Sequence, residues 1–207
     1  IRWGCIRLIE ICKILEINDP LIPEWEKINS KLADYQVDEK GFKLGKERSA
    51  PANHQHMSHL MMIYPLYLEN IDTSDDIELL KKSVRNFRPA TALPKMAASQ
   101  SSPAAATLGL GNLAQELMDG ILYSTAENEK LGKNGIYYLS TPCIETSLSY
   151  NTCVQDMLLQ SWGNKIRIFP ALPNNWTDIE FQDLRTEGAF LVSAKREQGK
   201  TSFVRIK

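Results

Sequence analysis

The sequence has no apolar run long enough to cross a membrane. The longest candidate, Leu60 to Leu68, is far shorter than the roughly 20 residues that a spanning helix requires, and Pro65 interrupts it. An excess of charge is also missing, because 24 Lys and Arg residues nearly balance 25 Asp and Glu residues, for a formal net charge of −1. We therefore expect no membrane span and no general attraction to nucleic acid.

Cysteine patterns typical of metal or redox sites are absent as well. Cys5, Cys12, Cys143 and Cys153 form no CxxC pair, and their spacing fits neither a zinc finger nor a dense disulfide framework. Free, buried thiols are the favoured interpretation, and a bridge between the first and second pairs is the alternative. No motif indicates a bound cofactor, and we expect none.

The first seventeen residues do not resemble a signal peptide. Charged side chains are spread through them, at Arg2, Arg7, Glu10, Lys13 and Glu16, where a signal peptide needs an uninterrupted apolar stretch. The chain begins without Met, inside a helical pattern. We therefore expect the natural start of the protein to lie upstream.

Helical patterning dominates the chain up to about residue 163. Apolar side chains recur at helical spacing in residues 1–17, and Asn18-Asp19-Pro20 is a strong stop signal. The Pro-, Ala- and Ser-rich residues 88–103 indicate a long connection. Further expected elements are a helix beginning near Pro23, a hairpin turning at Asp38 to Gly41, a helix capped by Thr73 or Ser74, and helices over 103–124 and 149–161.

After Trp162-Gly163 the pattern alternates between apolar and polar residues, as in strands. Strands are expected over 166–169, 179–184, 189–195 and 201–206, with a hairpin turn at 197–200. The sequence thus predicts a mainly α protein with a C-terminal β region.

All three histidines fall in one short segment, His54-Gln55-His56-Met57-Ser58-His59. The spacing His-x-His-x-x-His could bind zinc or copper, although no Cys or carboxylate cluster supports a metal site. The histidines could instead be satisfied by hydrogen bonds at the top of a helix. A third interpretation is sugar binding, in which the histidines contact hydroxyl groups and Tyr64 and Tyr67 cover an apolar sugar face.

Glu145 is an isolated charge in the neutral segment Thr141-Pro142-Cys143-Ile144-Glu145-Thr146-Ser147-Leu148, which leads into a helix. An inverting glycosidase needs two carboxyl groups, one that protonates the leaving oxygen and one that activates a water molecule. Glu145 could serve as such a base. It could equally be a surface residue at a helix N-terminus.

Three segments, in this order, resemble glycoside hydrolase family 95, the α-L-fucosidase family. His54 to Leu60 followed by Ile63-Tyr64-Pro65 is similar to the family signature His-Arg-His-x-Ser-His-Leu-x-x-x-Tyr-Pro. Met157 to Ser161 reads Met-Leu-Leu-Gln-Ser, as in the family, and aligning there places Glu145 on the Asp that is the family's general base. The tail Ile168-Phe169-Pro170-Ala171-Leu172-Pro173 matches the family's approach to its C-terminal β domain.

The resemblance implies part of an (α/α)6 toroid over residues 1–165, followed by a small antiparallel β domain over 166–207. It implies that His54, Gln55 and His56 bind the substrate, with the positions of Gln55 and His56 at the sugar in the deepest subsite, and that Glu145 is the catalytic base. Gln55 stands where the family has Arg, so the charge and the fork of donors are lost.

By this resemblance the chain is the C-terminal part of an inverting hydrolase that removes terminal α-L-fucosyl, or related α-L-galactosyl, residues from glycans. The expected partners are an oligosaccharide or glycan substrate and the missing N-terminal part of the same enzyme, which carries the general acid. We therefore expect this chain alone to be inactive. The alternative is an inactive, carbohydrate-binding remnant of the family, and the localisation implied by analogy is periplasmic or extracellular.

Overall fold

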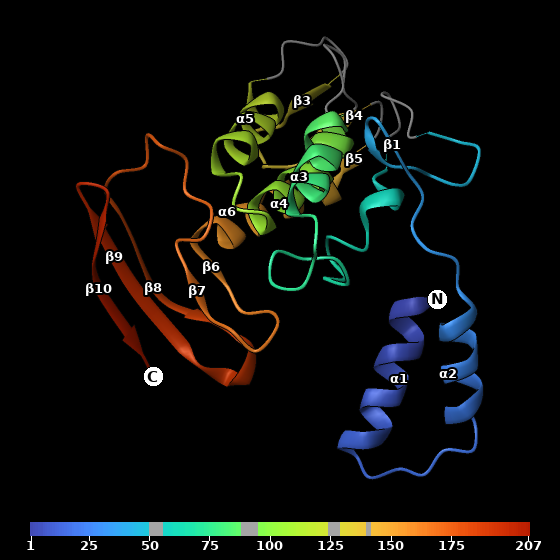
Figure 1. Ribbon diagram of the computed structural model, residues 1–207. Helices are drawn as coiled ribbons and strands as arrows, with labels where there is room; N and C mark the ends of the chain where they lie inside the picture. The colour runs from blue at the N-terminus through green and yellow to red at the C-terminus, as the bar shows by residue number, and fades with distance from the viewer. Residues whose placement is uncertain (50–55, 88–94, 124–128, 140–141) are drawn as a thin grey trace. The chain divides into compact units, whose positions relative to one another are not determined.

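The computed structural model describes residues 1–49, 56–87, 95–123, 129–139 and 142–207 (Figure 1). The chain divides into two compact units, Ile1–Gln36 and Val37–Lys207.

The first unit is a helical hairpin of α1 (Arg2–Ile14) and α2 (Ile22–Lys31). The connection turns at Asp19, whose carboxylate accepts a hydrogen bond from the Leu21 backbone N–H at 2.8 Å. Cys5 and Cys12, two turns apart on α1, are its buried side chains. Apolar side chains are exposed elsewhere on α1, at Leu8, Ile11 and Ile14, and at its C-cap Leu15.

The second unit is built around four helices, α3 (Ile77–Asn86), α4 (Lys95–Thr107), α5 (Gly111–Leu122) and α6 (Ile144–Leu158). In Figure 1 they form one group, in which α4 packs against both α5 and α6. The segment before α3 contains the 3-10 helix η1 (Ser58–Leu60).

Helix α4 can lie at the centre because its side chains are small, and Ala97, Ala104 and Ser102 are almost fully buried. Pro103 lies inside this helix and has no backbone N–H to donate to the carbonyl of Ser99, four residues earlier. The Ser102 hydroxyl donates to that carbonyl instead, at 3.2 Å. The expectation of a connection over 88–103 is therefore wrong from Lys95 onward, and residues 88–94 lie outside the described ranges.

Other helix ends differ from the sequence expectations for local reasons. The cap of α3 is Asp76, whose carboxylate accepts from the Leu79 N–H at 2.8 Å, and not Thr73 or Ser74. The helix expected over 103–124 is two helices, because the chain adopts a positive φ at Gly109 between α4 and α5. Helix α6 begins five residues before the expected Ser149.

The expected hairpin near residue 40 is confirmed as β1 (Val37–Asp38) and β2 (Gly41–Phe42). Gly41 has a φ of 125°, and a Cβ there would lie 2.7 Å from the Ser83 Cα of α3. The Ser83 hydroxyl accepts from the Phe42 N–H at 3.0 Å. A glycine is therefore required where the hairpin meets α3.

Two small sheets adjoin α6. Strands β3 (Glu129–Leu131), β4 (Tyr137–Leu139) and β5 (Pro142–Cys143) form an antiparallel sheet that leads directly into the helix. At its other end, β6 (Leu159–Gln160) pairs with β7 (Arg167–Ile168).

The last sheet has the order β10-β9-β8 and is antiparallel (Figure 1). Its strands are β8 (Ile179–Arg185), β9 (Leu191–Glu197) and β10 (Lys200–Ile206), and the 3-10 helix η2 (Glu187–Ala189) joins the first two. One face packs on the β6–β7 hairpin, where the Phe169 and Phe181 rings meet edge to face at 5.4 Å. The protein is thus mainly α with a C-terminal β region, as predicted, while the toroid and the division at residue 165 stay predictions.

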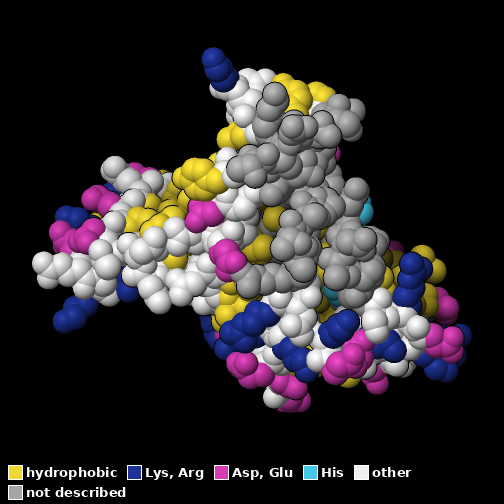
Figure 2. Space-filling view, turned by 90° about the horizontal axis from the view of Figure 1, so that it is seen from above, with side chains coloured by type: hydrophobic (Ala, Val, Ile, Leu, Met, Phe, Trp, Pro, Cys, Tyr) yellow, Lys and Arg dark blue, Asp and Glu magenta, His cyan; other side chains and the backbone are white. Residues whose placement is uncertain are grey.

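Charges of both signs are mixed on the face in Figure 2, where Lys and Arg side chains lie among Asp and Glu side chains. All four cysteines are buried and free, as the favoured interpretation predicted. Among the helices of the described ranges, none combines the length and the apolar character needed to span a bilayer.

Candidate functional site

A cavity of about 570 Å³ lies between the segment around η1 and helices α4 and α6. Among the described residues that line it there is no Asp, Glu, Lys or Arg, and methionine, tyrosine and proline supply the apolar part. Such a mixture suits a small ligand with several hydroxyl groups and an apolar face. Its lining residues include His56, Met61, Tyr64, Gln100, Ser149 and Thr152.

His56 is held in this wall by Gln100 of α4. The Gln100 side-chain oxygen accepts from the Met57 backbone N–H at 3.3 Å, and its amide nitrogen lies 3.3 Å from His56 Nδ1. If the amide donates to Nδ1, the hydrogen of the neutral imidazole is on Nε2. Gln100 thus orients the imidazole in the cavity wall.

Helix α6 supplies the opposite wall through Ser149 and Thr152. Glu145 is four residues before Ser149 and seven before Thr152, so the three positions share one face of the helix. The structure therefore places the two segments singled out in the sequence, the histidine cluster and the start of α6, near one cavity.

Glu145 itself is exposed on the first turn of α6 and is not among the residues that line the cavity. Its carboxylate accepts a hydrogen bond from the Cys143 thiol at 3.5 Å. Of the three predicted sugar-binding residues, His56 lines the cavity. The other two, His54 and Gln55, lie outside the described residues.

His59, the last member of the cluster, is in the core and not in the cavity. Its side chain is buried, and its ring meets Phe87 edge to face at 4.8 Å. Within the described part of the chain, no three His, Cys, Asp or Glu side chains gather as a metal site would require. His56 and His59 thus have different surroundings despite their spacing.

Asp156 lies one turn of α6 beyond Thr152 and was not singled out from the sequence. Burial raises the pKa of its carboxyl group to about 7, and a hydrogen bond from the Tyr64 hydroxyl acts in the opposite direction. Tyr64 also lines the cavity, and burial together with the Asp156 charge raises the pKa of its hydroxyl. A carboxyl group that titrates near neutral pH therefore lies directly behind the wall.

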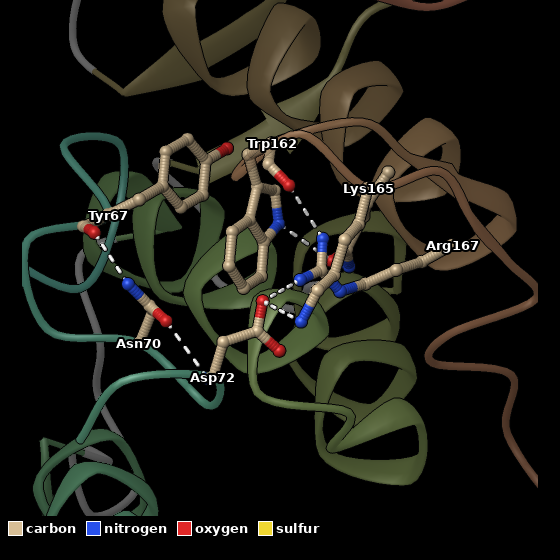
Figure 3. Close-up of polar contacts among 7 residues, drawn as sticks. Tyr67, Asn70, Asp72, Trp162, Lys165 and Arg167 are labelled. Atoms are coloured by element: carbon tan, nitrogen blue, oxygen red, sulfur yellow. Dashed lines mark hydrogen bonds and ion pairs between the residues drawn. The ribbon is translucent and has the colours of Figure 1, made fainter.

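An aromatic stack holds the chain that follows Tyr64. Tyr67 and Trp162 lie parallel, with ring centroids 5.1 Å apart, and the Arg167 guanidinium lies 3.6 Å from the centroid of the Trp162 ring (Figure 3). The Trp162 ring N–H donates to the Gln160 side-chain oxygen at 3.0 Å. The buried indole is thereby in contact on both of its faces.

Asp72 closes this network, as Figure 3 shows, by pairing with both Arg167 and Lys165. Asn70 fixes the intervening turn, because its amide donates to the Tyr67 carbonyl and its oxygen accepts from the Asp72 N–H, at 2.8 and 2.9 Å. The network fastens residues 67–72 to the β6–β7 hairpin and so supports the cavity wall at Tyr64.

Sequence reasoning missed Gln100 and Asp156. Gln100 fell in a stretch interpreted as a connection, so its role in a helix wall was not visible. For Asp156 a signal existed, because helical spacing from Glu145 through Ser149 and Thr152 reaches Asp156 on the same face.

No protein-family model matches the chain, and no curated protein matches its sequence.

Proposed function

We propose that the cavity between η1 and α6 binds a sugar ring, and that the chain belongs to an inverting glycoside hydrolase resembling the α-L-fucosidases. The observation that carries the proposal is that His56, from the histidine motif, and Ser149 and Thr152, on the face of α6 that begins with Glu145, line one cavity. Two motifs linked only by the resemblance thus contribute to one site.

The chemistry of the wall supports a carbohydrate ligand. Sugar hydroxyl groups need donors and acceptors with fixed directions, and His56 held by Gln100 provides one. Tyr64 and Met61 provide apolar area for the C–H groups of a sugar ring. The expected substrate is a glycan with a terminal α-L-fucosyl or related α-L-galactosyl residue.

Glu145 is the proposed general base, and the general acid is assigned to a segment upstream of this chain. An inverting mechanism needs the two carboxyl groups roughly 6.5–9.5 Å apart, on opposite faces of the sugar. The isolated chain is therefore expected to bind without hydrolysis. Turnover of 4-nitrophenyl α-L-fucoside that disappears in Glu145→Gln would contradict this assignment of the acid.

Sugar binding without catalysis is the second candidate function. One observation favours it, namely that the Glu145 carboxylate accepts from the Cys143 thiol and is not among the lining residues. The candidates differ in a longer protein that includes the upstream segment. Hydrolysis there that is lost in Glu145→Gln supports the enzyme, whereas equal sugar binding without hydrolysis supports the binding protein.

The shared claim is tested by calorimetric titration with methyl α-L-fucopyranoside. Thr152→Val removes one hydroxyl from the wall at nearly constant shape, and Thr201→Val does the same at an exposed position of β10. Loss of one hydrogen bond of about 1 kcal/mol weakens binding roughly fivefold. We expect that loss for Thr152→Val and for His56→Ala, with Thr201→Val unchanged, and equal affinity of all three would refute the proposed site.

A further inference from the structure

One long polar side chain leaves the central helix α4 and reaches the cavity wall. Over residues 97–107 this helix carries only alanine, serine, threonine and proline, apart from Gln100. The next residue, Ser101, is almost fully buried, and its hydroxyl donates to the Ala97 carbonyl at 2.7 Å. Gln100 therefore extends into the wall, beside His56, from a backbone position that is held by packing on both sides.

The two ends of the Gln100 amide contact two consecutive residues, and this settles which end is which. A backbone N–H can only donate, so the atom 3.3 Å from the Met57 nitrogen is the amide oxygen. The amide nitrogen is then the atom 3.3 Å from His56 Nδ1. Because an amide nitrogen can only donate, Nδ1 must accept, and the hydrogen of the neutral imidazole is on Nε2.

This arrangement decides what the side chains of His56 and Gln100, the His56–Gln100 corner, offer to a ligand. Whatever atom Nε2 of His56 meets, it meets as a donor. The second hydrogen of the Gln100 amide is also a donor, while the amide oxygen is turned toward the Met57 N–H. The other described side chains of the wall with strong polar groups carry hydroxyls, which donate and accept equally, namely Ser58, Tyr64, Ser149 and Thr152.

We propose that Gln100 is a positioning residue that holds His56 in the Nε2–H tautomer, so that the His56–Gln100 corner recognises a hydrogen-bond acceptor of the ligand. In a sugar this acceptor is the oxygen of a ring hydroxyl, and that part of the proposal rests on the proposed function. The tautomer is a property of the two side chains, so it can be measured without any sugar.

The experiment is ¹⁵N NMR of the histidine rings in the whole chain at about pH 8, where an ordinary histidine is neutral. The His56 signals are assigned by their loss in His56→Ala. We expect Nδ1 to show the shift of an unprotonated nitrogen and Nε2 that of a protonated one. A hydrogen on Nδ1 of the wild type would overturn the proposal.

A nearly isosteric variant shows whether Gln100 is responsible. Gln100→Glu keeps the side-chain length and an oxygen for the Met57 N–H, but the atom that faces Nδ1 becomes an oxygen, which cannot donate. We therefore expect the hydrogen to move to Nδ1. Gln155→Glu is the matched control, since it adds the same charge at an exposed position of α6, and it should leave the hydrogen on Nε2. An unchanged tautomer in Gln100→Glu contradicts the proposal.

An uncharged variant decides the matter should Gln100→Glu fail to fold. Gln100→Met has a similar size and removes both hydrogen bonds, so His56 should show a mixture of the two tautomers. A His56 ring that stays wholly in the Nε2–H form in this variant contradicts the role of Gln100.

A sugar series tests the acceptor and keeps failure of the two proposals apart. Affinities are measured by calorimetry for methyl α-L-fucopyranoside and for its deoxy and deoxyfluoro analogues at each ring hydroxyl, because fluorine accepts a hydrogen bond and cannot donate one. At one ring position the fluoro analogue should bind up to about fivefold more tightly than the deoxy analogue, and this advantage should vanish in Gln100→Glu. No such advantage at any position, or one that persists in Gln100→Glu, counts against the acceptor. A tautomer that reverses in Gln100→Glu without sugar binding to any form supports the positioning role and refutes the proposed function.

Discussion

Replacing Asp156 by Asn should make the protein relatively more stable as the pH rises. In the folded state burial raises the pKa of Asp156 to about 7, from an ordinary value of 3.8. Between these values the unfolded chain has lost this proton and the folded chain has kept it. Stability contributed by the group is therefore complete below about pH 4, falls as the pH rises, and is lost above about pH 7.

The expected size follows from the same two values. One pKa unit corresponds to about 1.4 kcal/mol, so between pH 5 and pH 8.5 the wild type should lose about 2 to 3 kcal/mol of unfolding free energy through Asp156 alone. Asp156→Asn has no carboxyl group there and escapes this loss. The free energy of unfolding of the variant minus that of the wild type should increase by that amount over this range.

The assay is urea unfolding of both proteins at several pH values, followed by circular dichroism. Asp178→Asn is a suitable control, because its carboxylate is exposed and its pKa is lowered by a hydrogen bond from the Thr177 hydroxyl. That control should show no increase relative to the wild type between pH 5 and pH 8.5. A difference between Asp156→Asn and the wild type that stays constant over this range would show that the Asp156 carboxyl group does not titrate with a raised pKa.

Three further substitutions test the packing that supports the site, each by its urea midpoint. Gly41→Ala should cost roughly 2 to 4 kcal/mol from steric overlap and a positive φ, whereas Gly45→Ala, which has open space around it, should change little. Trp162→Ala empties the stack under the cavity wall and should cost about 3 to 5 kcal/mol. Ser102→Ala leaves the Ser99 carbonyl without its side-chain donor and should cost about 1 to 2 kcal/mol. Equal midpoints for Gly41→Ala and Gly45→Ala, or wild-type midpoints for the other two, would contradict these contacts.

The sequence was most informative where local rules act alone. Asp19 and Pro20 end the first helical pattern, and α1 and α2 lie on either side of them. The alternating residues near the C-terminus form β8, β9 and β10. In β8 and β9 one side of the pattern faces a shared apolar layer, at Phe181, Val192 and Ala194, whereas β10 is exposed along its whole length.

Helix α4 shows where local rules fail. The alanine and serine side chains of this helix form no stripe of large apolar residues, and a proline such as Pro103 usually interrupts a helix. The helix forms nevertheless, because its small side chains allow close packing against α5 and α6. The Ser102 hydroxyl also supplies the hydrogen-bond donor that Pro103 lacks. Such a helix is recognised only once its neighbours are known.

The candidate site could be predicted only in part, because its contacts also depend on how the helices pack. His56 was recognisable because all three histidines of the sequence fall in one short segment, and the structure places it in the cavity wall. The partner that orients it, Gln100, is 44 residues away in the chain, so no local pattern relates them. The raised pKa of Asp156 likewise depends on burial beside Tyr64, which only the fold creates.

Binding of methyl α-L-fucopyranoside in the cavity can be mapped on the methionine methyl groups by NMR. Met57 and Met61 line the cavity, whereas Met118 is buried in α5. We expect saturable shifts of the Met57 and Met61 methyl signals, with Met118 unmoved and the shifts weakened in His56→Ala. Absence of saturable shifts at Met57 and Met61, or equal shifts in His56→Ala, would contradict it.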